Sequence, residues 1–257
     1  MEFTFYKYQG TGNDFVLIDN RDEFFPKTNV GLISKICDRR FGVGADGLML
    51  LENHSAADFK MVYYNSDGNP SSMCGNGGRC MVHFANFLGI ISEKTTFEAV
   101  DGEHKASIEN DWVSLKMSDV NNIKVEDTYT FLNTGSRHHV EVVKDLEYFD
   151  VFFKGREIRN NIYGEEGSNV NFVEQLDDSV FSVRTYERGV ENETLSCGTG
   201  VTAVALAMFK IGETDKNTVA LETLGGQLIV KFEDSENGFK NIFLEGPAKQ
   251  VFKGFWK

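Results

Sequence analysis

The sequence is poor in proline: Pro26, Pro70 and Pro247 are the only prolines among 257 residues, against 25 glycines. With 41% hydrophobic and 25% charged residues, the chain can bury a large core, which excludes disordered and fibrous classes. The 22 Phe and 8 Tyr, together with many glycines, favour a compact, β-rich globular protein with tight turns.

Long apolar runs are also missing. The longest candidate helix without charge or glycine, Val201 to Phe209, is far shorter than the roughly 20 apolar residues that a membrane span needs. The opening MEFTFYKYQG lacks the basic region and apolar core of a signal peptide. We therefore expect no membrane partner and a cytoplasmic location.

Basic residues are in the minority. The chain has 26 Lys and Arg against 39 Asp and Glu, which gives a formal charge of −13. A polyanion would be repelled, and the sequence has no Lys/Arg cluster that could follow a phosphate backbone. Nucleic acid is excluded as an expected partner.

Common ligand-binding patterns are absent too. The Cys74-x₅-Cys80 spacing is not that of a zinc site, and the five His residues form no matching pair, so we expect no metal. The Gly-rich segment after Cys74 lacks the Lys-Ser/Thr of a phosphate-binding loop, and no G-x-G-x-x-G opens a βαβ unit. A C-x-x-C redox pair is also missing.

An internal repeat with a period of 123 residues organises the chain. Cys74-Gly-Asn-Gly77 aligns with Cys197-Gly-Thr-Gly200, and each cysteine lies 15 residues before a glycine that follows an apolar run. The same register aligns Gly12-Asn13 with Gly135-Ser136. We predict two similar domains, 1–122 with Cys74 and 123–257 with Cys197, and the final strand belongs to the second or crosses back to the first.

The hydrophobic periods predict many strands and three helices. The expected strands are Phe3–Tyr8, Asp14–Asp19, Phe59–Tyr64, Val113–Met117, His139–Val143, Val180–Thr185, Gln227–Phe232 and Asn241–Glu245. The expected helices are Val30–Arg39, Gly75–Leu88 and Gly198–Ile211. Since Thr202 to Phe209 is apolar all round, each domain is predicted to be a sheet wrapped on a central helix.

Cys74 and Cys197 both stand at a predicted helix start. Unpaired backbone N–H groups and the helix dipole favour a thiolate there, and the same N–H groups can hold a carboxylate. Two such thiols could remove and return a proton on opposite faces of a carbon next to that carboxylate. A non-catalytic carboxylate-binding or redox-sensing protein, or plain buried cysteines, are the alternatives. Cys37 and Cys80 lack this setting and are predicted to be core residues.

Six motifs together resemble the diaminopimelate epimerase family. They are Tyr8-Gln-Gly-Thr-Gly-Asn-Asp-Phe15, Arg40-Phe-Gly-Val-Gly-Ala-Asp-Gly47, Asn65-Ser-Asp-Gly68, Met73-Cys-Gly-Asn-Gly-Gly-Arg-Cys80, Gly167-Ser-Asn-Val-Asn-Phe172, and Tyr186-Glu-Arg-Gly189 followed by Leu195-Ser-Cys-Gly-Thr-Gly200. The likeness spans nearly the whole chain. Racemases related to this family share the paired cysteines but not the full motif set.

The resemblance implies an α+β fold of two pseudo-symmetric domains, each a barrel-like, mostly antiparallel sheet around a central helix. It implies an isomerase that interconverts LL- and meso-diaminopimelate without a cofactor, in the biosynthesis of lysine and of peptidoglycan precursors. It also implies a homodimer. An epimerase for proline, hydroxyproline or another amino acid is the alternative within the fold.

The resemblance also assigns roles to individual residues. Cys74 and Cys197 would be the catalytic acid/base pair, and His138 and Glu187 would adjust the thiol pKa values. The substrate-binding residues would be Asn13, Asn65, Gly75, Asn76, Ser136, Asn169, Glu187, Arg188, Gly198 and Thr199. A guanidinium and amides suit a carboxylate, because they fork onto it and fix its orientation.

Two departures from the family pattern bear on the site. Gly135-Ser-Arg-His138 replaces the Gly-Asn-Pro-His of many members, so Ser136 stands in place of an amide and Arg137 in place of proline. Should that turn shift by one residue, His139 would take the role of His138. Gly47 stands where some members have Gln, so a side-chain contact is in doubt there.

Overall fold

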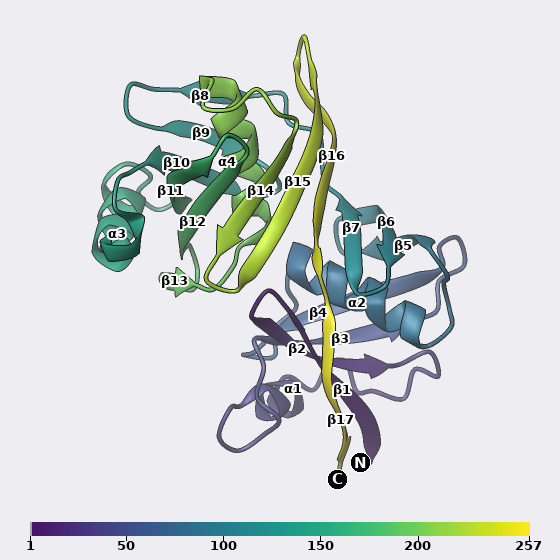
Figure 1. The fold of residues 1–257 in the computed structure, drawn as a ribbon. Helices are drawn as coiled ribbons and strands as arrows, with labels where there is room; N and C mark the ends of the chain where they lie inside the picture. Colours follow the sequence, from purple (N-terminus) through teal and green to yellow (C-terminus); the bar gives the residue numbers. More distant parts are fainter. Residues whose placement is uncertain (1) are drawn as a thin grey trace. The chain divides into compact units, whose positions relative to one another are not determined.

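The computed structural model describes residues 2–257, so the first residue of the predicted domain 1–122 lies outside the described residues. Contacts divide the chain into two units (Figure 1). Unit 1 comprises the residues up to Leu115 together with Gly246–Lys257, and unit 2 comprises Lys116–Glu245.

Unit 1 is built mainly from strands, with two helices. Its elements are β1 (Phe3–Gly10), β2 (Asn13–Asp19), α1 (Val30–Cys37), β3 (Gly47–Glu52), β4 (Phe59–Asn65), α2 (Gly75–Phe87), β5 (Lys94–Ala99), β6 (Gly102–Glu109), β7 (Trp112–Lys116) and β17 (Lys249–Trp256). Strand β17 pairs antiparallel with β1, so the C-terminal strand and the N-terminal strand lie side by side (Figure 1).

Unit 2 has the same kind of composition. Its elements are β8 (Ile123–Val125), β9 (Thr130–Asn133), β10 (Arg137–Val142), a 3₁₀ turn (Leu146–Tyr148), α3 (Val151–Asn161), β11 (Asn169–Asp177), β12 (Val180–Glu187), β13 (Asn192–Thr194), α4 (Gly198–Ile211), β14 (Thr218–Thr223), β15 (Gly226–Ser235) and β16 (Gly238–Pro247).

The two units share one strand topology. In unit 1, β1–β2 is antiparallel, β2–β3 parallel, β3–β4 antiparallel and β4–β5 parallel, and β5–β6 and β6–β7 are antiparallel. Unit 2 repeats this order with β9–β10, β10–β11, β11–β12, β12–β14, β14–β15 and β15–β16. The helices also occupy matching positions. The first parallel pair of each unit is connected through α1 (β2 to β3) or α3 (β10 to β11), and the second through α2 (β4 to β5) or α4 (β12 to β14). The predicted fold class is confirmed.

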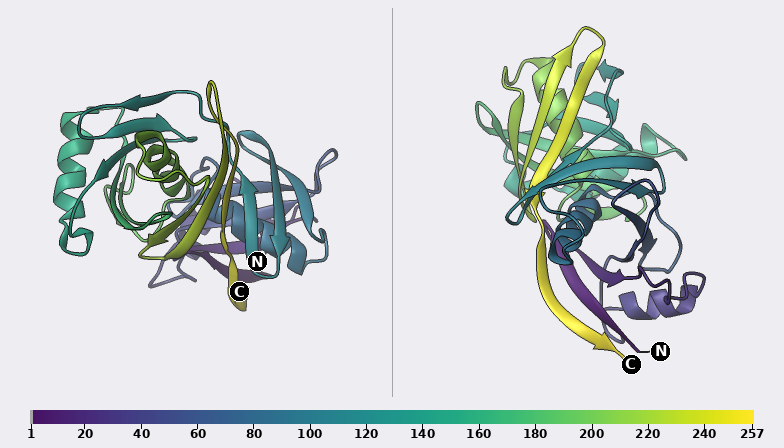
Figure 2. Two further views of the ribbon diagram at one scale, coloured as in Figure 1. Left: turned by 45° about the horizontal axis from the view of Figure 1, so that its top comes forward. Right: turned by 90° about the vertical axis from the view of Figure 1, so that its right-hand side faces the viewer.

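Helix α4 is the core of unit 2. Residues Val201 to Met208 are all buried, and all but Thr202 belong to one hydrophobic cluster with side chains from β9–β12 and β14–β16. The left view of Figure 2 shows the strands curving around this helix. Gly212 ends the helix at φ 82°, a conformation that suits glycine. In residues 2–257, no helix has both the length and the apolar composition that crossing a membrane requires.

Helices α1 and α3 differ from what the sequence predicts. Helix α1 ends at Cys37 rather than Arg39, because the Asp38 carboxylate accepts the backbone N–H groups of Arg40 and Phe41, both at 2.7 Å, and turns the chain. Helix α3 was not predicted. Only Val151 and Gly155 of α3 are buried, so its sequence carries little amphipathic signal, although Asp150 caps its N-terminus.

Candidate active site

Cys74 and Cys197 are the N-cap residues of α2 and α4, with nearly the same extended backbone: φ −120°, ψ 123° for Cys74 and φ −123°, ψ 110° for Cys197. Neither side chain makes a capping hydrogen bond within its own helix. The N–H groups of the first turns have no helical acceptor, and the helix dipole adds positive potential, so each N-terminus suits an anion. The glycine after each cysteine lets a ligand approach the backbone closely.

In unit 1, Asn13 connects the turn after β1 with the start of α2. Its Oδ1 accepts from the sulfur of Cys74 at 3.6 Å and from Nδ2 of Asn76 at 3.4 Å. Its Nδ2 donates to Oδ2 of Asp46 at 2.5 Å, which fixes the orientation of the amide because a carboxylate only accepts. The structure thus brings together Asn13, Cys74 and Asn76, with Gly75 between the last two.

A cluster of charges holds Asp46 in place. Arg39 bridges Asp46 and Asp14, with Nη2 to oxygen distances of 2.7 and 2.6 Å, and Lys7 adds a 2.6 Å contact to Asp14. Burial alone would raise the pKa of Asp14, but the hydrogen bonds from Arg39 and Lys7 outweigh it and lower this pKa to about 2. Asp14 therefore stays ionised, and the network supports the amide of Asn13 through Asp46.

Arg79 is a buried residue for which the sequence predicts no function. It lies in the first half of α2 and is fully buried, and its Nη2 donates to the hydroxyl of Thr11 at 3.1 Å. Thr11 and Gly12 form the two-residue turn before Asn13, and both have positive φ, at 49° and 85°. Arg79 therefore ties the helix that begins after Cys74 to the turn that carries Asn13.

Asn65 lies at the end of β4, and its side chain is exposed. Its backbone N–H donates to the carbonyl of Asn69 at 2.9 Å, and its register partner on β3 is Gly47. A Cβ atom at Gly47 would lie 2.4 Å from Cε2 of Tyr63 and 2.5 Å from the carbonyl oxygen of Tyr64. The ring of Tyr63 and the backbone of Tyr64 leave no room for a side chain, so position 47 contributes no side-chain contact in this chain.

Gly47→Gln is expected to lower the free energy of unfolding by about 1–3 kcal/mol, since strands β3 and β4 must separate to admit Cβ. Urea denaturation followed by circular dichroism measures this. Gly31→Gln is the control, because the nearest atom to a Cβ at Gly31 is Oδ1 of Asn29 at 3.8 Å. Equal stability of wild type and Gly47→Gln would contradict the steric argument.

In unit 2, His138 and Thr199 form a chain of contacts to Cys197. Nε2 of His138 lies 3.0 Å from Oγ1 of Thr199, which lies 3.5 Å from the sulfur of Cys197. Burial, and then the charge of Arg188, lower the pKa of His138 to about 3, so the imidazole is neutral at neutral pH. His139 points elsewhere: its Nδ1 lies 2.9 Å from the hydroxyl of Tyr163 and its ring stacks on Tyr129.

The other predicted residues of unit 2 gather around Asn169. Its Nδ2 donates to the hydroxyl of Ser136 at 3.2 Å, and its Oδ1 accepts the backbone N–H of Arg188 at 2.9 Å. Nη1 of Arg188 donates to the carbonyl of Glu166 at 2.8 Å. Glu187 is the last residue of β12 and is half-buried. Three segments distant in sequence therefore meet at one amide.

Arg137, which replaces the family's proline, has partners of its own. Its guanidinium forms an ion pair with Glu166 and lies 5.6 Å from the centroid of the Phe131 ring. His138, the next residue, lies beside Thr199 although Arg137 stands in place of proline.

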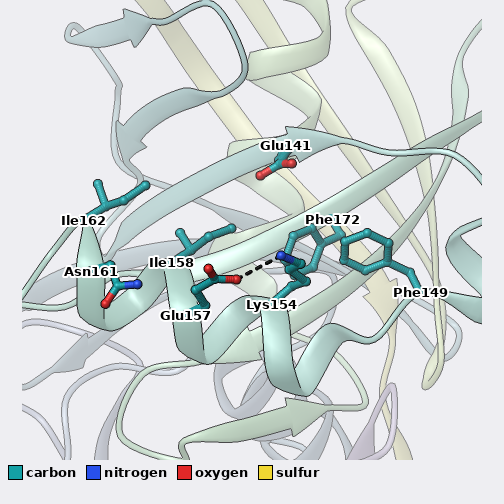
Figure 3. Close-up of a pocket in the computed structure, with 8 residues that line it drawn as sticks. All are labelled: Glu141, Phe149, Lys154, Glu157, Ile158, Asn161, Ile162 and Phe172. Carbon is teal, nitrogen blue, oxygen red and sulfur yellow. Dashed lines mark hydrogen bonds and ion pairs between the residues drawn. The ribbon is translucent and has the colours of Figure 1, made fainter.

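Three further observations concern residues away from these clusters. Burial raises the pKa of Cys37 and of Cys80 to about 12, which suits their predicted place in the core. Within residues 2–257, no group of three or more His, Cys, Asp or Glu side chains is placed to hold a metal. A surface pocket in unit 2 lies between α3 and the sheet, with the Lys154–Glu157 ion pair at its edge, and it includes none of the predicted site residues (Figure 3).

The fold is that of a known group of proteins. A PhzF-family phenazine biosynthesis protein from Bacillus anthracis superposes with a TM-score of 0.81 at 13% identity, covering 100% of this chain and 99% of its own. A hydroxyproline epimerase from Agrobacterium vitis gives a TM-score of 0.70 at 14% identity, covering 99% and 91%. At such low identity these likenesses define the fold and no more.

Sequence relatives are much more similar. The family model described as diaminopimelate epimerase matches residues 5–123 and 130–251. The protein named diaminopimelate epimerase from Flavobacterium psychrophilum is 59% identical over 96% of this chain and 98% of its own length. The one from Chlorobaculum tepidum is 42% identical over 95% and 98%. The chain belongs to the diaminopimelate epimerase family, and it is an isomerase of the epimerase type.

Proposed function

We propose that this protein interconverts LL- and meso-diaminopimelate with two thiols and without a cofactor. The observation that carries the proposal is the equivalent placement of Cys74 and Cys197 as N-caps of the two central helices, each followed by glycine. The names of the relatives and the full set of motifs favour diaminopimelate over proline or hydroxyproline as the substrate.

In the proposed mechanism, one cysteine thiolate takes the proton from the α-carbon. The electron pair of the broken C–H bond is delocalised into the neighbouring carboxylate, whose growing negative charge the first-turn N–H groups of Gly75-Asn76 and Gly198-Thr199 stabilise. The thiol of the other cysteine then gives its proton to the opposite face of the carbon. The reverse direction exchanges the roles of the two sulfurs.

The remaining predicted residues would bind the substrate end that does not react. In this proposal Asn13, Asn65, Ser136, Asn169 and Arg188 bind its carboxylate, and the Glu187-Arg188 segment receives its ammonium group. The hydrogen bonds of Asn169 to Ser136 and to the backbone of Arg188 support a shared role for these three residues.

Conversion of the substrate tests the proposal. Reduced protein is incubated with LL-diaminopimelate, and the isomers are separated by chiral chromatography. We expect growth of the meso isomer to an equilibrium mixture and no racemisation of L-proline or hydroxyproline under the same conditions. Turnover of proline without turnover of diaminopimelate would assign the other substrate. Failure to convert either amino acid would contradict the proposal.

Arg188→Met is expected to raise KM by about 10- to 100-fold, because a hydrogen bond to a charged group contributes roughly 1.5–3 kcal/mol. Initial rates over a range of diaminopimelate concentrations measure this. The control is Arg156→Met, which removes an exposed guanidinium from α3. An unchanged KM in Arg188→Met would show that this guanidinium does not bind the substrate.

We also propose a homodimer formed through β17. One edge of this strand pairs with β1, and its side chains Val251 and Phe255 are 57% and 54% exposed. A second copy would bury these apolar side chains. Light scattering should give twice the 28.9 kDa chain mass for the wild type. It should give the chain mass for Val251→Glu/Phe255→Glu, whereas Leu224→Glu, at an exposed position in unit 2, should stay dimeric. A monomeric wild type would refute this.

A role in the biosynthesis of lysine and peptidoglycan precursors would follow from this substrate. The cytoplasmic location stays a prediction.

A further inference from the structure

Asn171 is a buried residue of β11 whose side-chain orientation is determined by its neighbours. Its Nδ2 donates to the carbonyl oxygen of His139 at 2.9 Å, and its Oδ1 accepts from the hydroxyl of Thr185 at 3.0 Å. A carbonyl oxygen can only accept, so the amide cannot be flipped. The second N–H of Nδ2 is then directed at Nδ1 of His138, 3.2 Å away.

This contact selects the tautomer of His138. Since Asn171 donates to Nδ1, that nitrogen carries no proton. The imidazole is fully buried and neutral at neutral pH, so its proton is on Nε2. Nε2 therefore donates to Oγ1 of Thr199 at 3.0 Å.

The direction of this bond decides what Thr199 offers to Cys197. With its oxygen accepting from His138, the hydroxyl is able to donate its own hydrogen to the sulfur at 3.5 Å. In the opposite tautomer, the threonine hydrogen would go to Nε2, and Thr199 would offer the sulfur an acceptor instead of a donor. A donated hydrogen bond stabilises a thiolate, whereas an acceptor stabilises a thiol.

The surrounding backbone keeps these groups in register. The hydroxyl of Thr134 donates to the carbonyl of Thr199 at 2.8 Å, which holds the first turn of α4. A Cβ at Gly200 would lie 2.5 Å from Oδ1 of Asn171 and 3.3 Å from the sulfur of Cys197, so glycine permits the close approach of helix and strand. The hydrogen bond at Cys74 has the opposite direction: the sulfur of Cys74 donates to Oδ1 of Asn13, whereas the sulfur of Cys197 accepts from Thr199.

We propose that Asn171 and Thr199 are positioning residues for Cys197: Asn171 holds His138 as the Nε2–H tautomer, and the Thr199 hydroxyl consequently donates to the sulfur and favours its thiolate. The inference deepens the proposed function, on which it rests, by giving one of the two thiols its own activating chain.

The first test measures the reactivity of Cys197 without substrate. Each variant is alkylated with iodoacetamide at one neutral pH, and peptide mass spectrometry gives the rate at Cys197. Thr199→Val, which keeps the shape and loses the hydroxyl, should slow alkylation about tenfold, as expected for loss of one hydrogen bond to a charged sulfur. Thr199→Ser should retain the rate.

Thr202→Val is the matched control. Thr202 is buried three residues further along α4, but its hydroxyl donates to the carbonyl of Gly198 at 2.9 Å. Cys197 of the Thr202→Val variant should therefore be alkylated at the wild-type rate. A Thr199→Val variant that alkylates at the wild-type rate would overturn the proposal, as would a Thr199→Ser variant as slow as Thr199→Val.

The second test observes the imidazole directly. Proton–nitrogen correlation spectra of ¹⁵N-histidine-labelled protein, with His138 assigned from its absence in His138→Gln, should show a protonated Nε2 and a bare Nδ1. A protonated Nδ1 would contradict the assignment. Asn171→Leu, if it folds, should lose this single tautomer. Both readouts are independent of turnover, so a protein that meets them without converting diaminopimelate would refute the proposed function and support this inference.

Discussion

Cys74→Ala and Cys197→Ala are each expected to lower kcat/KM for epimerisation by about 10²- to 10⁴-fold, the usual contribution of a positioned acid or base. In the proposed mechanism one sulfur breaks the C–H bond and the other forms the new one, so neither can replace its partner. Rates of meso-diaminopimelate formation under reducing conditions measure the loss.

Cys37→Ala separates loss of chemistry from loss of packing. Cys37 is buried in α1, and burial raises its pKa to about 12, so it is a poor nucleophile. Its replacement should lower the free energy of unfolding and leave kcat/KM near the wild-type value. If either Cys74→Ala or Cys197→Ala kept full activity, the two-thiol account would be wrong.

The second large effect concerns stability against pH. In the unfolded chain, the imidazole of His138 binds a proton near pH 6.5. In the folded protein, burial and the charge of Arg188 lower the pKa of His138 to about 3. Between these values the unfolded state holds more protons, so the free energy of unfolding falls as the pH falls through this window, by up to about 1.4 kcal/mol per pH unit from this group.

His138→Gln cannot titrate, and its unfolding free energy should fall less steeply from pH 6.5 towards pH 3. Urea denaturation at a series of pH values compares the two proteins. Asp14, whose pKa is lowered from its ordinary value of 3.8 to about 2, also makes the unfolding free energy fall at low pH. This contribution is the same in both proteins, so it cancels in the comparison. Parallel curves for the wild type and the variant would mean that His138 titrates normally.

The glycine-rich cysteine motifs were sufficient to predict where the central helices begin. A cysteine followed by Gly-Asn-Gly or Gly-Thr-Gly, an apolar run and a glycine 15 residues later specifies an N-terminus, a buried helix and a left-handed C-terminus in order. The structure has α2 and α4 starting at Gly75 and Gly198. The internal repeat likewise predicted that the two units share one topology. Strands with one buried face keep an alternation of apolar and polar residues, with a period of two.

Other features depend on contacts that no local pattern encodes. Helix α3 buries only Val151 and Gly155, so its polar sequence resembles a loop. Asn171 lies two residues after Asn169 on the same strand face, but its importance comes from the pairing of β11 with β10, which brings it to His138. Arg79 is similar: a guanidinium in a helix is normally exposed, and its hydrogen bond to the hydroxyl of Thr11 joins residues that are distant in the sequence.

The central claim, that two different thiols handle the proton, is tested most directly in deuterium oxide. LL-diaminopimelate is incubated with reduced protein, the reaction is stopped early, and the isomers are separated and analysed by proton NMR. We expect the meso product to carry deuterium at the inverted carbon, because its proton comes from the second, solvent-exchanged thiol, while the remaining LL isomer keeps its α-protons. Product that retains the original proton, or deuterium that enters unreacted LL substrate as fast as product forms, would indicate a single base and contradict the account.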